Sequence, residues 1–283
     1  MKAIQRNMNP HAAKPISLAS LARSMWSNRQ LILQMTKRDV IGRYKGSVMG
    51  VMWSLFNPLF LLLIYTFVFS VVFKARWGTD LPDSKSQFAT LLFVGMIVHG
   101  LFAETLNRAP GLILGNVSYV KKIVFPLEIL PVVAIGAALF HALVSVLVLL
   151  IAFVVFNGYL QWTTVFLPLI LLPLLVLTLG AAWALASLGV YLRDVAQPIS
   201  LIMTVLLFAS PVFYPITALP ERIRPWLMLN PLTFVIEQTR AILIFGQLPD
   251  WTGLAAYSLV SVLIAWAGYA WFQKTRKGFA NVL

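Results

Sequence analysis

Long apolar runs alternate with shorter polar segments along the chain. A helix that crosses the hydrocarbon core of a bilayer needs about 20 predominantly apolar residues. The run at residues 88–106 is weaker than the others, because His99 and Glu104 lie in its second half. It is counted as a span because, without it, the two ends of the chain would lie on opposite sides of the membrane. The pattern therefore predicts an all-α membrane protein whose six spans cover residues 48–73, 88–106, 127–156, 162–191, 195–213 and 251–272.

The polar segments between these runs predict further elements. Residues 20–46 mix apolar side chains with bases, as an amphipathic helix lying on a membrane surface does. The loop 107–126 has room for a short helix. The outer segment 214–250 is too long for a turn, and its prolines precede a mostly apolar, helix-like stretch at 232–245. This composition favours short re-entrant helices that dip into the outer leaflet.

The composition agrees with a lipid environment. The chain is 60% hydrophobic and 11% charged, whereas a soluble domain carries roughly 25% charged residues. A net charge of +13 would suggest nucleic-acid binding in a soluble protein. Here the bases lie outside the apolar runs, so they are better explained by membrane topology, and no nucleic-acid partner is expected.

The distribution of bases predicts the orientation of the chain. With six spans, 16 of the 22 Lys and Arg residues fall on the side that holds residues 1–47 and the tail 274–283, and five of the nine acids fall on the other side. Because basic loops stay in the cytoplasm, we expect both termini to be cytoplasmic, on either side of a membrane domain at 48–273. Residues 1–47 are too polar for a cleavable signal peptide.

The chain lacks the usual signatures of covalent chemistry. It has no P-loop for ATP and no G-x-S-x-G nucleophile elbow. Its three histidines are far apart in sequence, and it contains no cysteine, which excludes disulfides and thiolate metal sites. We therefore expect no catalytic residue, metal or cofactor in this chain. Active transport would draw its energy from a partner or from an ion gradient.

The segment 36–58, TKRDVIGRYKGSVMGVMWSLFNP, is the most informative motif. A basic helix containing Arg38, Asp39, Arg43 and Tyr44 leads directly into the first span. The alternative interpretation is an ordinary juxtamembrane anchor. The motif also spaces three glycines by four residues, a pattern that allows helices to approach closely; they are Gly42, Gly46 and Gly50.

Two further motifs lie on the basic side. The segment 118–131, SYVKKIVFPLEILP, could dock a short helix into a soluble subunit through Lys121 and Lys122. Positive-inside charge alone would also explain these lysines. The segment 191–198, YLRDVAQP, predicts a tight turn, for which a structural role is the simpler explanation.

The remaining candidates lie within or near the spans. The segment 210–215, SPVFYP, could form a hinge or simply a kink at Pro211. His99, Glu104 and His141 are ionisable residues inside spans and so are functional candidates, although helix–helix hydrogen bonds explain them comparably well. Six aromatic residues could present their rings to sugars in a channel or anchor the protein at the interface: Phe56, Tyr65, Trp183, Phe208, Phe213 and Tyr214.

In this order, the four motifs resemble the polysaccharide-export branch of ABC permeases, which includes O-antigen, teichoic-acid and capsule exporters. The resemblance covers residues 30–275 and implies a bacterial inner-membrane location. It also implies a working unit of two permeases and two ABC ATPase subunits that moves a lipid-linked polysaccharide among the membrane lipids. ATP and Mg²⁺ would be bound by the ATPase chains.

The resemblance assigns roles to residues. A coupling segment at about 112–122 would seat in the ATPase through Gly115, Asn116, Val117, Ser118, Tyr119, Lys121 and Lys122. Arg38, Asp39, Arg43 and Tyr44 would line the cytoplasmic entrance. Periplasmic gate helices would occupy 215–247, with Pro211, Pro215, Pro231, Glu237 and Arg240 as gate residues.

Other functions stay open at this point. Within the ABC class, O-antigen is the first expectation, and teichoic acid, capsule, a drug or a small lipid are the alternatives. A secondary transporter would need ionisable residues at mid-membrane and usually inverted repeats, and no repeat is evident in the sequence. A membrane glycosyltransferase would need more acidic residues on the cytoplasmic side than Asp39 and Asp194.

Overall fold

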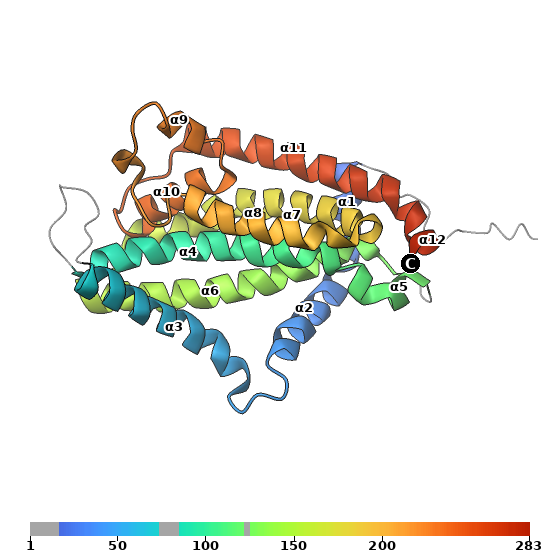
Figure 1. Cartoon of the computed structure of the whole chain (residues 1–283), viewed down its shortest axis with the longest axis horizontal. Coiled ribbons are helices and arrows are strands. Elements are labelled where there is room, and N and C mark those ends of the chain that lie inside the picture. Colours follow the sequence, from blue (N-terminus) through green and yellow to red (C-terminus); the bar gives the residue numbers. More distant parts are fainter. Residues whose placement is uncertain (1–16, 74–84, 122–124) are drawn as a thin grey trace, which may run out of the picture.

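The computed structural model describes residues 17–73, 85–121 and 125–283, and all regular structure within these ranges is helical (Figure 1). Five segments are long and apolar enough to cross a membrane: Gly50–Phe69, Phe88–Gly111, Leu127–Asn157, Trp162–Tyr191 and Trp251–Val282. Their main helices are α3 (Trp53–Tyr65), α4 (Lys85–Arg108), α6 (Leu130–Asn157), α7 (Leu167–Tyr191) and α11 (Trp251–Thr275). The short helix η1 (Gly50–Met52) precedes α3, and the π-helix η2 (Thr66–Val72) follows it.

The helix in the predicted fifth span is shorter than expected. Helix α8 (Ala196–Ala209) has 14 residues, or about 21 Å at 1.5 Å per residue, whereas the hydrocarbon core is about 30 Å thick. It ends there because Pro211 lacks a donor and disfavours a helical conformation at Ser210, whose backbone is extended. The described residues therefore contain five candidate spans, and the prediction of six long spans is not confirmed.

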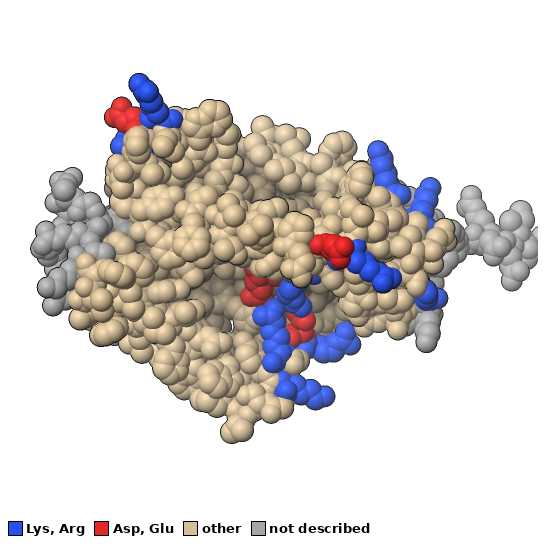
Figure 2. Space-filling model, viewed as in Figure 1, with Lys and Arg blue, Asp and Glu red and all other residues tan. Residues whose placement is uncertain are grey.

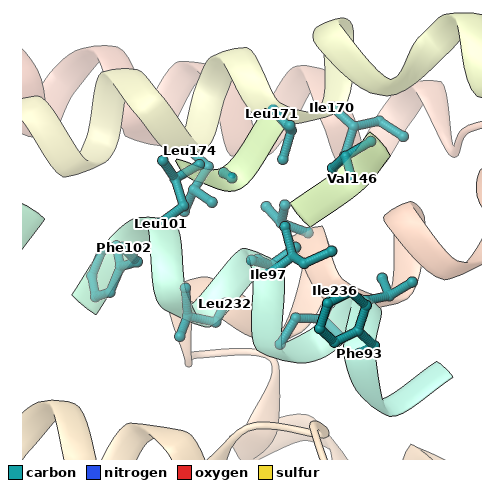
Figure 3. Packing of buried hydrophobic residues seen from close by; sticks show 14 of the residues in the cluster. Phe93, Ile97, Leu101, Phe102, Val146, Ile170, Leu171, Leu174, Leu232 and Ile236 are labelled. Carbon is teal, nitrogen blue, oxygen red and sulfur yellow. The ribbon is translucent and has the colours of Figure 1, made fainter. Parts of the chain in front are cut away.

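Helix α4 forms the centre of the bundle. It packs against α3, α6, α7, α8 and α10 (Pro231–Leu243). Of its most apolar stretch of 18 residues, 83% is buried inside the protein. Because protein rather than lipid surrounds it, α4 can carry the polar residues that made this span the weakest in the sequence. Figure 3 shows its core contacts, which involve Phe93, Ile97, Leu101, Phe102, Val146, Ile170, Leu171, Leu174, Leu232 and Ile236.

The backbones of α7 and α11 approach each other so closely at one contact that there is no room for a side chain between them. A Cβ atom added at Gly268 would lie 2.0 Å from the carbonyl oxygen of Gly180, and one added at Gly180 would lie 2.6 Å from the Cα of Ala265. Small residues at such contacts let two backbones meet directly. This glycine pair was not singled out in the sequence, because the two residues lie on different spans.

The three glycines of the segment 36–58 make no close helix contact within one copy of the chain. A Cβ atom added at Gly42, Gly46 or Gly50 would meet no atom within 4 Å. Gly46 has a φ of 89° and lies after the end of α2, where a left-handed backbone favours glycine. Of the three glycines, Gly46 is the one that forms the turn between α2 and the first span.

The expected N-terminal helix is divided into two. Helix α1 (Leu18–Ser27) is followed by α2 (Arg29–Arg43), with Asn28 between them. Helix α2 packs across α6, where a Cβ added at Gly136 would lie 2.9 Å from the Oγ1 of Thr36. The amphipathic pattern is clear in α1, whereas α2 buries Met35 and Val40 against the bundle and also exposes apolar side chains.

The remaining elements lie at the two ends of the bundle (Figure 1). At one end are α1, the short helix α5 (Val117–Lys121) and α12 (Phe279–Val282). The helices α9 (Arg224–Leu227) and α10 lie toward the opposite end. Short helical turns connect the rest: η3 (Ala109–Gly111), η4 (Leu114–Asn116), η5 (Leu127–Ile129), η6 (Trp162–Phe166), η7 (Arg193–Val195), η8 (Ile216–Ala218) and η9 (Arg276–Gly278).

The glycine contact between α7 and α11 gives a stability prediction. We expect Gly268→Ala to lower the free energy of unfolding by about 3 kcal/mol or more, because the added Cβ overlaps backbone that cannot move aside. Thermal unfolding of the purified protein in detergent measures this effect. Gly100→Ala in α4 is the control, since its Cβ would meet nothing within 4 Å; equal melting temperatures for the two variants would contradict the assignment.

Candidate transport site

The end of α2 is held to the membrane spans by a cluster of polar side chains. The Arg43 guanidinium donates to Glu104 on α4 at 2.5 Å. The Nδ1 atom of His141 on α6 lies 3.1 Å from both Glu104 oxygens, and its Nε2 lies 3.2 Å from the Tyr44 hydroxyl. These contacts are satisfied when Nδ1 carries a proton toward Glu104 and Nε2 accepts from Tyr44. Burial raises the pKa of the Tyr44 phenol, which keeps it a donor.

The other two predicted entrance residues also make long-range contacts. Asp39 accepts two hydrogen bonds of 2.8 Å from Arg108 at the end of α4. Arg38 donates to the Tyr119 hydroxyl of α5 at 3.1 Å. All four predicted residues therefore connect α2 to the spans or to the predicted coupling segment. The sequence indicates Glu104 and His141 only as individual ionisable candidates and Arg108 only as one of the basic residues. It does not show their partners, because the pairing depends on how the helices pack.

Polar and apolar cavities lie beside α2. A cavity of about 330 Å³ has a mixed lining: Arg43, Tyr44, Glu104 and His141 lie on it with Ser54, Asn57 and Ser145, and apolar residues of α3, α4 and α6 form the rest. Figure 2 shows the acidic and basic side chains gathered around a hollow in this face of the molecule. An apolar cavity of about 730 Å³ lies between α2, α6 and α7. A ligand beside α2 could thus meet polar groups in one cavity and hydrocarbon in the other.

The predicted gate segment is anchored by Arg240. Its guanidinium is buried and donates to the carbonyl oxygens of Leu91 at 3.0 Å and Val212 at 3.0 Å, and to Glu237 at 2.7 Å. Gly95 makes room for this contact, since a Cβ there would lie 3.2 Å from the Arg240 Nη2 atom. Arg240 thus fastens α10 to α4 and to the segment after α8.

The predicted gate prolines lie near this anchor. Pro211 is buried, Pro215 is half-buried at the start of η8, and Pro231 begins α10. The Asn230 amide caps α10 by accepting from the Leu232 N–H at 2.9 Å and donates to the Ser210 hydroxyl at 2.9 Å. The loop after α8 and the start of α10 are consequently joined.

Five of the six predicted channel aromatics lie on α3 or on α8 and the loop that follows it. Phe208 stacks on Phe213, with ring centroids 5.5 Å apart, and the Tyr214 hydroxyl donates to the Phe208 carbonyl. The sequence did not single out Phe69. Its ring centroid lies 6.4 Å from the ring centroid of Tyr65 and 6.4 Å from that of Phe213. It therefore links the rings of α3 to those after α8. Phe56 lies nearer the start of α3, 6.3 Å from Phe60.

Trp183 is placed differently. Its side chain is fully buried, donates to the carbonyl oxygen of Glu128 at 2.9 Å and packs edge-on against Tyr269 at 5.2 Å. The prediction that Trp183 contacts substrate is wrong for this conformation, since its ring has no exposed face. Trp183 is a packing residue, because the part of α7 that carries it lies inside the bundle.

The predicted coupling segment lies at the end that carries α12. Gly115, Ser118 and Lys121 are exposed, while Asn116, Val117 and Tyr119 are half-buried. Tyr119 stacks on Phe125 at 4.3 Å, and Lys121 donates to the carbonyl oxygen of Leu283. Lys122 lies outside the described residues. Arg193 and Asp194 of the predicted turn are exposed in η7, and His99 is buried with its Nε2 atom 2.9 Å from the Met203 carbonyl oxygen.

The described residues contain no group of three or more His, Cys, Asp or Glu side chains that could hold a metal ion. The polar side chains are instead used in pairs that join helices.

Comparison with known proteins places the chain in a family. The family described as ABC-2 type transporter matches residues 30–244, so the chain belongs to the ABC-2 type transporter membrane family. It is 28% identical over 263 residues to the O-antigen export system permease protein RfbA of Myxococcus xanthus, covering 92% of this chain and 98% of that protein.

Two further relatives are similar over most of their length. The RfbA permease of Klebsiella pneumoniae is 25% identical over 255 residues, covering 89% of this chain and 95% of the relative. The polysialic acid transport protein KpsM of Escherichia coli is 25% identical over 238 residues, covering 82% of this chain and 89% of the relative. The family match contains the entrance cluster, the coupling segment and the Arg240 anchor.

The Arg240 anchor gives a testable prediction. Arg240→Met is expected to reduce the free energy of unfolding by about 2–3 kcal/mol, because it leaves buried carbonyl groups without a charged donor. Thermal unfolding in detergent measures the loss, and Arg222→Met, at an exposed arginine, is the matched control with an expected change within about 0.5 kcal/mol. The anchor would be rejected if the two substitutions shifted the melting temperature equally.

Proposed function

We propose that the chain is the channel-forming permease subunit of an ATP-driven exporter that moves a lipid-linked polysaccharide, O-antigen in the first instance, across the bacterial inner membrane. The observation that carries this proposal is the family match over residues 30–244 together with near full-length similarity to O-antigen export permeases. The structure supports it through a cavity of mixed polar and apolar lining beside α2, within a bundle of candidate membrane-spanning helices.

The proposed topology has six crossings and cytoplasmic termini. Helix α8 together with the following segment 210–213 would complete the fifth crossing, with α10 dipping into the outer leaflet. Bases gather at the end of the bundle that carries α5 and α12 (Figure 2). Because basic segments stay in the cytoplasm, this end would face the cytoplasm, and α9 and α10 would face the periplasm.

The proposed channel forms between two copies of the chain. Helix α8 exposes Leu201, Ile202, Val205 and Phe208, and α3 exposes much of its apolar surface. These surfaces would face the second copy and the lipid. The aromatic rings of Tyr65, Phe69, Phe208, Phe213 and Tyr214 would then offer flat faces to successive sugar rings, and stacking of this kind depends little on sugar sequence.

The energy for transport would come from two copies of a separate ABC ATPase subunit. ATP binding would draw the ATPase subunits together and move the coupling segment, residues 112–122. Arg38 links this segment to α2 through Tyr119, and Arg43 links α2 to the spans through Glu104. Movement of α5 would therefore reach the entrance directly, where the lipid-linked end of the polymer would be admitted.

A capsule polysaccharide is the second candidate substrate. The similarity to the polysialic acid transport protein favours it, although that relative aligns over a smaller share of this chain than the O-antigen permeases do. Both candidates need the same membrane subunit and differ in the polymer that is moved. Export assays with each polymer would separate them.

Single cysteines can test the topology, since the chain has no cysteine of its own. In spheroplasts we expect a membrane-impermeant maleimide to label Thr217→Cys in η8 and to leave Ser118→Cys in α5 unlabelled until the membrane is permeabilised. Both positions are exposed, so access to the reagent depends on the side of the membrane. Labelling of Ser118→Cys in intact spheroplasts would overturn the orientation.

The ATPase partner can be tested at the coupling segment. We expect Lys121→Glu to weaken co-purification of the ATPase subunit about tenfold, and Lys121→Glu/Lys122→Glu to weaken it further, because like charges would face each other across the interface. Arg222→Glu at the other end makes the same charge change and should have no effect. Unchanged co-purification of the double variant would contradict the coupling assignment.

A vesicle assay then separates the possible classes of transporter. Vesicles that contain the chain and its ATPase should move labelled lipid-linked polysaccharide only when ATP is present. Vesicles that contain the chain alone should not move it, with or without an ion gradient. Gradient-driven transport by the chain alone would indicate a secondary transporter instead.

A further inference from the structure

A buried ion pair lies directly after the coupling segment. Glu128, in η5, has no exposed surface, and the Arg276 side chain is 2% exposed. The Arg276 Nη1 atom donates to the Glu128 carboxylate at 2.8 Å, and its Nη2 atom donates to the carbonyl oxygen of Phe125 at 3.2 Å. The two residues are separated by 148 positions in the sequence, so only the folded chain brings them together.

The same carboxylate also holds the N-terminal helix. The Ser24 hydroxyl of α1 donates to Glu128 at 2.9 Å, and the Glu128 backbone carbonyl accepts from Trp183 of α7. Glu128, Arg276, Ser24 and the Phe125 carbonyl form what is called here the 128–276 latch. It joins the start of the third span to the N-terminal segment, to α7 and to the last described segment of the chain.

That last segment, residues 276–283, packs against the coupling helix. Phe279 is fully buried against Phe272 and Tyr191, with ring centroids 5.5 Å and 6.1 Å away. The Lys121 ammonium of α5 donates to the carbonyl oxygen of Leu283. Figure 1 shows α5 and α12 at the same end of the bundle. The segment thus contacts the coupling helix at Lys121 and the latch at Arg276.

The coupling helix reaches the latch by a second route. Its Tyr119 stacks on Phe125 at an interplanar angle of 13°, and the Phe125 carbonyl accepts from Arg276. The helix is therefore held to the latch through Tyr119 on one side and through residues 276–283 on the other. A push on α5 would move these groups together as one body.

A contribution to stability is a weak explanation for a buried ion pair, because burying its two charges is electrostatically costly. Removing a carboxylate and a guanidinium from water is costly, and replacing a buried pair by apolar residues of similar size is often neutral or stabilising. In some proteins a buried ion pair fixes one arrangement of the segments that it joins, and charged hydrogen bonds such as those of Arg276 are directional.

We propose that the 128–276 latch, with residues 276–283, makes the coupling helix and the start of the third span move as a rigid unit, so that ATP hydrolysis by the partner is converted into transport. Glu128 and Arg276 are positioning residues in this scheme and do not touch the substrate. This inference rests on the proposed function.

The test uses an apolar replacement that keeps the fold. Glu128→Leu/Arg276→Met is combined with the ATPase subunit in vesicles, and both ATP hydrolysis and polysaccharide export are measured. We expect ATPase association and hydrolysis to stay within twofold of the original protein, and the amount exported per ATP to fall at least tenfold. Lys274→Met, an exposed neighbour on α11, is the control and should leave export per ATP unchanged.

The outcomes separate the two proposals. If the original protein shows no ATP-dependent export, the proposed function is wrong. If the original protein and the double variant export equally well per ATP, the latch is structural and the present inference is wrong. If the double variant does not assemble, Phe279→Ala replaces it, because this change loosens residues 276–283 without altering a charge; normal export per ATP in that variant also overturns the inference.

A cross-linking measurement is independent of any substrate. The Lys121 ammonium contacts the carbonyl oxygen of Leu283, so cysteines introduced by Lys121→Cys and Leu283→Cys should lie within reach of a bismaleimide whose spacer is about as long as the lysine side chain. The yield should fall at least fivefold when Glu128→Leu/Arg276→Met is added, because residues 276–283 are then released from the coupling helix. An unchanged yield would show that the latch does not hold them.

Discussion

The fold depends on the pairing of the ionisable side chains that lie among the membrane-spanning helices. Helix α4 carries three ionisable residues along the bundle: His99 is buried among the helices, whereas Glu104 and Arg108 are only partly exposed and lie toward the end of the helix. Each is paired with a neighbouring helix: His99 with the backbone of α8, Glu104 with α2 and α6, and Arg108 with α2. Leaving one of these groups unpaired would cost more than an ordinary packing fault.

This pairing also connects the regions to which the proposed function assigns roles in transport. The cluster around Glu104 joins the end of α2 to the spans, and Arg38 joins α2 to the coupling segment. At the opposite end, Arg240 fastens α10 to α4 and to the loop after α8. Helix α4 is thus in contact with both the proposed entrance and the proposed gate, which places it where a movement at one end can affect the other.

The apolar surface shows the complementary side of the same constraint. Helices α3 and α8 expose large hydrophobic side chains, which in a soluble protein would be an aggregation hazard. In a bilayer, lipid can cover such surfaces without cost, and in the proposed homodimer part of them would be covered by a second copy. The aromatic rings of α3 and of the loop after α8 lie close together within one chain, so a single copy already assembles one wall of the proposed channel.

The sequence by itself determined the class of the protein, because hydropathy, span length and the charge of loops are local properties that survive without knowledge of packing. It also singled out Arg38, Asp39, Arg43, Tyr44 and Arg240, which the structure places in contacts between helices. Tertiary structure alone decided their partners, since Arg43 meets Glu104 across 61 residues and Arg276 meets Glu128 across 148. It also ended α8 at Ala209, buried Trp183 and placed the close glycine contact between α7 and α11. These features depend on which helix surfaces face each other, and a pattern read along one chain does not contain that information.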